Sequence, residues 1–143
     1  MFDPLSMQYV HFTLAYWCLL VAALLPIACA ALAKAGKFGV PRREGGFDNE
    51  NPRVWLARQK DWRARANAAQ ANSFEALPLF MAAVIIAHQL GAPQGRLDIL
   101  AFLWVFLRVL YVMMYVAGFG KARSVVWATA LVVNIGILFI GYR

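Results

Sequence analysis

Long apolar stretches, separated by shorter polar segments, make up most of the chain. Four of them cover about residues 10–33, 66–90, 97–117 and 124–142. A helix of roughly 20 apolar residues crosses the hydrocarbon core of a bilayer, and these runs reach that length. They are continuous, without the alternation of a membrane β-strand. The pattern predicts one all-α domain over residues 1–143, an antiparallel bundle of four transmembrane helices.

The composition indicates the same class of protein. Apolar residues make up 62% of the 143-residue chain, against about 45–50% in soluble domains. A domain of this size keeps much of its surface exposed. With so many apolar residues, much of that surface must be apolar, so its natural solvent is lipid. The net charge of +7 does not indicate a nucleic-acid partner, because nine of the fourteen basic residues lie in segment 34–65 and no groove-reading motif accompanies them.

The basic residues also predict an orientation. Segment 34–65 and the connection that contains Lys121 and Arg123 both carry positive charge, which places both in the cytoplasm and both chain termini outside. Segment 34–65 is rich in Gly, Pro and charge and is predicted to be an exposed loop. The first span is predicted to be a retained anchor, because Asp3 precedes it and its apolar run is too long for a signal peptide.

The second span carries polar residues on one face. Arg65, Ala68, Asn72 and Glu75 follow an i, i+3, i+7, i+10 spacing, which places them on one side of a helix. Glu75 is the only acidic residue well inside a predicted span. A carboxylate buried there without a partner is costly, so we expect it to have one.

The third span supplies a complementary set. Arg108, Tyr111 and Tyr115 follow an i, i+3, i+7 spacing. An arginine at membrane depth costs about 2.5–3.5 kcal/mol even on insertion scales, so it should face the bundle interior or a wet cavity. Glu75 and Arg108 each lie about 15 Å from the cytoplasmic ends of their spans, at ~1.5 Å per residue. We expect the two to share one polar cluster, which either fixes helix register or binds a ligand.

Four further polar residues have simple interpretations when taken alone. Arg123 is typical of an interfacial side chain that extends to the headgroups, and Ser124 of a helix cap. Asn134 indicates an interhelical hydrogen bond, and His88 an interfacial side chain. No His, Cys or carboxylate spacing in the sequence is typical of a metal site.

Three motifs carry a resemblance to a known family. They are AxxNSFEALPLF in the second span, RVLYVMMY in the third, and ARSV before the fourth. With them the chain resembles the MAPEG family, the membrane-associated proteins in eicosanoid and glutathione metabolism, and looks most like its short bacterial members. The resemblance implies a homotrimer in a bacterial inner membrane, with glutathione bound as cosubstrate between neighbouring subunits in the cytoplasmic half of the bilayer.

The resemblance also implies which residues bind glutathione. The family's asparagine and glutamate of the second span fall on Asn72 and Glu75. Its third-span arginine and the tyrosine seven residues later fall on Arg108 and Tyr115, and Tyr111 takes the place of another site tyrosine found in some members.

Two cationic positions complete this set. The family's arginine that stabilises the glutathione thiolate falls on Arg123, with Ser124 beside it, which makes these the expected catalytic residues. The family's usual arginine four residues before the asparagine is replaced by Ala68. Arg65, one turn earlier on the same face, is the nearby cation that we expect in its place.

Two functions follow as expectations. The first is a glutathione-dependent transferase or peroxidase that acts on lipophilic electrophiles or lipid hydroperoxides. The second is a non-catalytic trimeric scaffold or lipid-ligand-binding protein, because the family contains a non-enzymatic member that presents lipid-like ligands to a partner enzyme.

Overall fold

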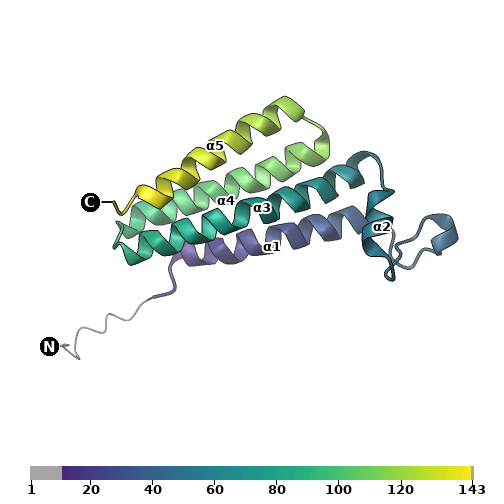
Figure 1. The fold of residues 1–143 in the computed structure, drawn as a ribbon, viewed down its shortest axis with the longest axis horizontal. Helices are drawn as coiled ribbons and strands as arrows, with labels where there is room; N and C mark the ends of the chain where they lie inside the picture. The colour runs from purple at the N-terminus through teal and green to yellow at the C-terminus, as the bar shows by residue number, and fades with distance from the viewer. Residues whose placement is uncertain (1–10, 143) are drawn as a thin grey trace.

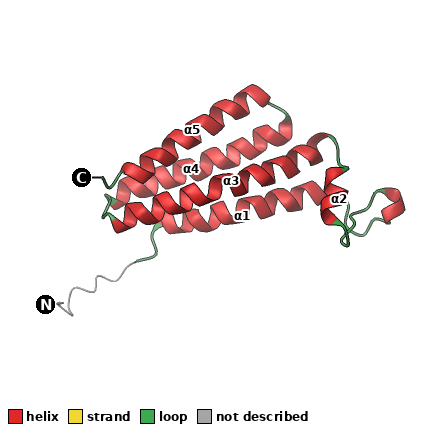
Figure 2. Ribbon diagram, viewed as in Figure 1, coloured by secondary structure: helices red, strands yellow, loops and turns green. Residues whose placement is uncertain are grey.

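Four long helices form an antiparallel bundle in the computed structural model, which describes residues 11–142 (Figures 1 and 2). They are α1 (Leu14–Lys34), α3 (Asp61–Gln89), α4 (Gln94–Ala117) and α5 (Gly120–Phe139). All four are long and apolar enough to cross a membrane. No strand occurs among the described residues, so the predicted four-helix fold is confirmed. The start of the first predicted span, near residue 10, lies outside the described residues.

Several helix ends differ from the predicted spans. Helix α3 begins at Asp61 rather than near residue 66, and α5 begins at Gly120 rather than near residue 124. Ser124 is therefore not a helix cap, and that interpretation was wrong. It lies inside α5, where its Oγ donates to the carbonyl of Gly120 at 3.1 Å.

The connection from α1 to α3 has structure of its own. It contains a 3-10 turn, η2 (Arg42–Glu44), and a short helix, α2 (Pro52–Ala57). The Phe47 ring packs edge-on against Trp55, which is buried. Arg42 lies within ion-pair distance of Asp48 and Glu50, and its hydrogen bond lowers the pKa of the Glu50 carboxyl. Much of this segment is exposed, but it is not an irregular loop throughout.

The two basic connections lie at the same end of the bundle. Figure 1 shows the α1–α3 connection and the α4–α5 turn together at one end, which we call the basic end. Gly118 terminates α4 there in a left-handed conformation (φ 88°), and the Phe119 N–H donates back to the Met114 carbonyl at 3.0 Å. Helix α5 starts directly after this turn, which places its first residues beside the last turn of α4.

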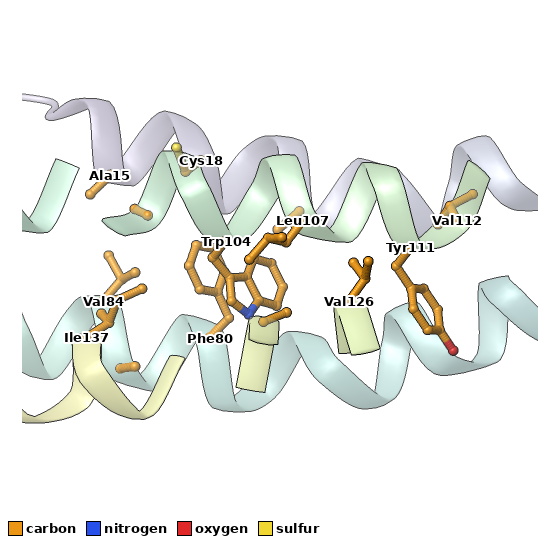
Figure 3. Packing of buried hydrophobic residues seen from close by; sticks show 14 of the residues in the cluster. Ala15, Cys18, Phe80, Val84, Trp104, Leu107, Tyr111, Val112, Val126 and Ile137 are labelled. Atoms are coloured by element: carbon orange, nitrogen blue, oxygen red, sulfur yellow. The ribbon is translucent and has the colours of Figure 1, made fainter. Parts of the chain in front are cut away.

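Small residues allow the helices to approach closely. Helix α1 packs on α3 and α4, and α5 packs on α4 and α3. Much of the core is alanine, which favours close contact between membrane helices. The buried alanines are Ala15, Ala22, Ala33, Ala66, Ala69, Ala83, Ala87, Ala101 and Ala130. The Phe80 and Trp104 rings stack between α3 and α4 with centroids 3.8 Å apart (Figure 3).

Large apolar side chains cover the outside of the bundle. Ile99 and Val132 are each 69% exposed, and Ile27 is 59% exposed. Surface patches of this kind are rare on soluble monomers. On four helices of spanning length they are surfaces for lipid, so the chain is an integral, multi-pass membrane protein.

Candidate functional site

Arg108 lies in the interior of the bundle, on the side of α4 that faces α3. Its side chain is only 2% exposed, and its Nη2 donates to Oδ1 of Asn72 at 2.8 Å. The Nδ2 of Asn72 in turn donates to Oε2 of Glu75 at 3.3 Å, one turn further along α3. The predicted cluster therefore exists, but its two charged side chains are linked through an asparagine.

Aromatic rings provide part of the surroundings of Arg108. Its guanidinium lies over the Tyr111 ring at 4.3 Å and near the Trp104 ring at 6.0 Å. Both rings come from the same face of α4 as the arginine. Cation–π contact offsets part of the loss of hydration of a buried guanidinium. Its Nε nevertheless has no hydrogen-bond partner among residues 11–142.

A second group of site residues lies where α4 meets α5, nearer the basic end. The guanidinium of Arg123, in the first turn of α5, lies over the Tyr115 ring at 4.0 Å. The Tyr115 ring meets Tyr111 edge-on at 5.6 Å, which connects this group to Arg108. A hollow of about 210 Å³ opens here, lined by Asn72, Tyr111, Arg123, Ser124 and Trp127, and we call it the basic-side hollow.

A cleft of about 180 Å³ adjoins this hollow, deeper in the bundle. We call it the deep cleft; its lining includes Asn72, Glu75, Trp104, Arg108, Trp127 and Asn134. Asn72 and Trp127 line both spaces, so the two are neighbours. The structure thus brings seven of the eight predicted site residues into one connected region. They are Asn72, Glu75, Arg108, Tyr111, Tyr115, Arg123 and Ser124.

Asn134 is a lining residue that the sequence interpretation did not assign to the site. It was expected to form an interhelical hydrogen bond. Its side chain is 2% exposed, and its Oδ1 has no hydrogen-bond partner among the described residues. The only signal in the sequence was a lone amide among the apolar residues of the fourth span.

Comparison with known families decides the identity of this bundle. The model of the MAPEG family matches residues 14–142, nearly the whole chain. The chain belongs to the MAPEG family. The curated proteins and the solved structures that were compared with it gave no match. Membership supports a glutathione-related membrane transferase or peroxidase, or a related function, in general terms.

In this MAPEG protein Arg65 lies apart from both spaces. Its Nε donates to the backbone carbonyl of Val116 at 2.8 Å, and its guanidinium lies beside Gly118. Ala68 borders a separate hollow of about 470 Å³ on the outer side of α3, and Arg53 of α2 is part of the lining. Arg53, and not Arg65, shares this hollow with Ala68.

The candidate site presents charges suited to a zwitterionic ligand. Arg108 and Arg123 are fixed cations, which attract carboxylates or a thiolate. Glu75 is exposed on the protomer and is the carboxylate available to an ammonium group. Rings of Tyr111, Tyr115 and Trp127 separate these groups, so the region offers both ionic and apolar contacts.

Proposed function

We propose that the protein is a glutathione-dependent transferase or peroxidase that acts on lipophilic electrophiles or lipid hydroperoxides. The observation that carries this proposal is the arrangement of Arg108, Asn72 and Glu75 beside Arg123. Glutathione has two carboxylates, one ammonium and one thiol. The site offers Arg108 for a carboxylate, Glu75 for the ammonium, and Arg123 as a separate cation for the sulfur.

Arg123 is the proposed activator of the thiol. The thiolate is the nucleophile, and a nearby cation lowers the pKa of a thiol. In conjugation, the sulfur forms a bond to the electrophilic carbon while the leaving group departs with its electron pair. In peroxide reduction, two glutathione molecules are oxidised to the disulfide, and the hydroperoxide is reduced to an alcohol and water. Ser124, beside Arg123, lines the same hollow.

We also propose that the working unit is a homotrimer with this site between subunits, in the cytoplasmic half of a bacterial inner membrane. Glu75 supports this arrangement. It is exposed on the single protomer, although it lies well inside a spanning helix. A carboxylate facing lipid at that depth is costly, so a neighbouring subunit or a ligand is expected to cover it.

The decisive experiment is glutathione binding to the detergent-purified protein by titration calorimetry. We expect wild type to bind at millimolar or lower concentration and Arg108→Leu to bind at least tenfold more weakly. Arg96→Leu is the matched control, because Arg96 is an exposed arginine at the other end of α4. Arg123→Ala should lower turnover far more than binding. No binding by the wild type at millimolar concentration contradicts the proposal.

The second candidate is a non-catalytic trimeric scaffold or lipid-ligand-binding protein of the same fold. The observation in its favour is that the site has few cations. Ala68 replaces the family's usual arginine, and Arg65 lines neither the basic-side hollow nor the deep cleft. The same titration distinguishes the two candidates, because the scaffold is expected to bind lipid and not glutathione.

A further inference from the structure

A separate hollow lies between α2 and α3, on the outer side of α3. Its volume is about 470 Å³, and it shares no lining residue with the deep cleft or the basic-side hollow. We call it the α2–α3 hollow; its lining includes Arg53, Leu56, Asn67, Gln70, Ala71 and Phe74. A space of this size is within the range of ligand pockets, and the proposed glutathione site does not include it.

Arg53 is the only charged residue in the lining of this hollow. The ion pairs among the described residues involve Arg42 and Arg43. Arg63 and Arg65 instead donate to backbone carbonyls. Arg53 takes part in none of these contacts and is exposed. A guanidinium suits the oxygen atoms of a phosphate, so Arg53 is available to an anion from outside the protomer.

The walls of the hollow change from polar to apolar with depth in the membrane. Helix α3 has 29 residues and is about 43 Å long, which exceeds the ~30 Å hydrocarbon core, so its first turn lies among the headgroups. Figure 1 shows α2, which carries Arg53, at the basic end beside the start of α3. Asn67 and Gln70 lie about 9 and 14 Å beyond that start, and Phe74 about 20 Å beyond it. A phospholipid has its charged, ester and acyl groups in the same order.

The two amides favour a ligand with ester groups over bare hydrocarbon. Asn67 and Gln70 are half-buried, and neither side chain is hydrogen-bonded to another residue in the part of the chain that the structure describes. An amide that faces hydrocarbon without a partner is costly. Amide N–H groups donate to carbonyl oxygens, which the esters of a phospholipid provide. Leu56 and Phe74 offer apolar contact to the methylene groups that follow.

We propose that the α2–α3 hollow binds an anionic phospholipid from the leaflet at the basic end. Its phosphate contacts Arg53, its ester carbonyls accept from Asn67 and Gln70, and the upper part of one acyl chain lies against Phe74. The lining contains no carboxylate, so the ammonium of a zwitterionic headgroup finds no partner there. The proposal does not depend on glutathione, because the hollow is separate from the proposed glutathione site.

The test is a lipid titration of the detergent-purified protein, followed by native mass spectrometry. The probes are dioleoylphosphatidylglycerol and dioleoylphosphatidylcholine, which have the same acyl chains, so a difference in affinity reports the headgroup. We expect wild type to bind the phosphatidylglycerol about fivefold more tightly, and Arg53→Gln to reduce this preference to within about twofold. Arg58→Gln is the matched control, because Arg58 is an exposed cation at the end of α2 that does not line the hollow.

Three results overturn the site. Equal binding of the two lipids by the wild type means that the headgroup is not recognised. An equal loss of preference in Arg53→Gln and Arg58→Gln means that the lipid is attracted by the charge of the whole connection. Thermal unfolding with millimolar inorganic phosphate supplies the third: stabilisation equal to that by phosphatidylglycerol means that the ligand is a soluble anion.

A neighbouring subunit is the competing occupant of the hollow, and Ala71→Phe tests it. The larger side chain fills the space, so we expect this variant to lose bound phosphatidylglycerol while its oligomeric mass, measured by light scattering, stays that of the wild type. Loss of the oligomer identifies the hollow as a contact between copies and overturns the lipid site. If Ala71→Phe does not fold, Ala71→Leu takes its place with the same expectation.

Glutathione titration separates this site from the proposed function. Arg53→Gln should bind glutathione within about twofold of the wild type. Weaker glutathione binding by Arg53→Gln assigns Arg53 to the glutathione site and overturns the lipid site. Absent glutathione binding by the wild type, with an intact preference for phosphatidylglycerol, overturns only the proposed function.

Discussion

Asn72 lies between Arg108 and Glu75 and contacts both. Its Oδ1 accepts from Arg108 at 2.8 Å, and its Nδ2 donates to Glu75 at 3.3 Å. The ion pairs present among the described residues all lie in the α1–α3 connection, so none joins Arg108 and Glu75 directly. A ligand that carries a carboxylate and an ammonium can therefore bind both side chains without displacing an internal ion pair.

The first prediction concerns how strongly these side chains are coupled. Double-mutant cycles combine Arg108→Leu with Asn72→Leu, and Arg108→Leu with Glu75→Gln. Because a hydrogen bond to a charged group contributes about 1.5–3 kcal/mol, we expect coupling of that size for the Asn72 pair. For the Glu75 pair we expect less than about 1 kcal/mol, because the contact is indirect. Unfolding of the purified variants in detergent measures both values, and stronger coupling in the Glu75 pair would show a direct contact.

The second prediction concerns the ring under Arg123. A cation–π contact at a partly exposed site contributes about 0.5–1 kcal/mol. Tyr115→Leu removes the ring, so we expect turnover with glutathione to fall roughly two- to fivefold. Tyr115→Phe keeps the ring at 4.0 Å and should stay near the wild-type rate. Steady-state rates with a soluble electrophile measure both. Equal losses of turnover in Tyr115→Phe and Tyr115→Leu would assign the effect to the phenol hydroxyl instead.

The third prediction concerns the pH dependence of turnover. If Arg123 stabilises the thiolate, its removal raises the pKa of bound glutathione, and a more alkaline solution is needed for the same rate. Arg123→Gln should therefore move the rising limb of the pH–rate profile upward by about one unit, which corresponds to ~1.4 kcal/mol. Arg123→Lys keeps the charge and should shift the limb less. A profile that falls in height without moving would exclude this role for Arg123.

The helices and the faces of the site residues could be predicted from the sequence. Continuous apolar runs determine where a membrane helix can lie, and the helical period places Arg108, Tyr111 and Tyr115 on one side. The periodicity does not determine how two packed helices are rotated about their axes. For that reason it indicated a shared cluster for Arg108 and Glu75 but did not reveal Asn72 as the direct contact.

The sequence did not predict where the helices end, nor whether the buried Asn134 side chain has a hydrogen-bond partner. The sequence GFGK contains two glycines, and only the backbone shows that Gly118 terminates α4 and that Gly120 already belongs to α5. This shift placed Ser124 inside a helix. Asn134 was expected to find a partner on another helix, yet its oxygen faces none among the described residues. Whether Asn134 finds a partner depends on how closely α3, α4 and α5 pack around it, and the sequence does not give that packing.

The fourth prediction tests whether Arg65 binds the ligand or stabilises the fold. Its hydrogen bond to Val116 satisfies one of the last carbonyls of α4, which have no partner within the helix. Arg65→Ala should lower the free energy of unfolding by about 1–2 kcal/mol, somewhat less than a fully buried charged hydrogen bond. Glutathione affinity should stay within about threefold. Thermal unfolding and calorimetry on the same preparation measure both. A tenfold weaker affinity at unchanged stability would identify Arg65 as a ligand-binding residue, as we expected from its position one turn before Ala68.

The fifth prediction concerns the opposite end of the bundle, where His88 joins α3 to α1. The ring stacks on Tyr16 with centroids 4.1 Å apart, and Nδ1 lies 2.8 Å from the Val84 carbonyl. A carbonyl only accepts, so Nδ1 carries a proton and donates to it, and Nε2 forms a hydrogen bond with the Thr13 hydroxyl at 3.0 Å. That hydroxyl oxygen also accepts from the Tyr16 N–H and caps the start of α1.

His88→Ala removes both the stacking and the hydrogen bonds, so it should destabilise the bundle by roughly 1–3 kcal/mol. His88→Phe keeps an aromatic ring against Tyr16 but loses both hydrogen bonds, and an intermediate loss is expected. His11→Ala is the control, because His11 is exposed. Thermal unfolding in detergent ranks the three variants. If His88→Ala unfolds at the same temperature as His11→Ala, the contacts of His88 contribute nothing to the docking of α1, and His88 is only an interfacial side chain.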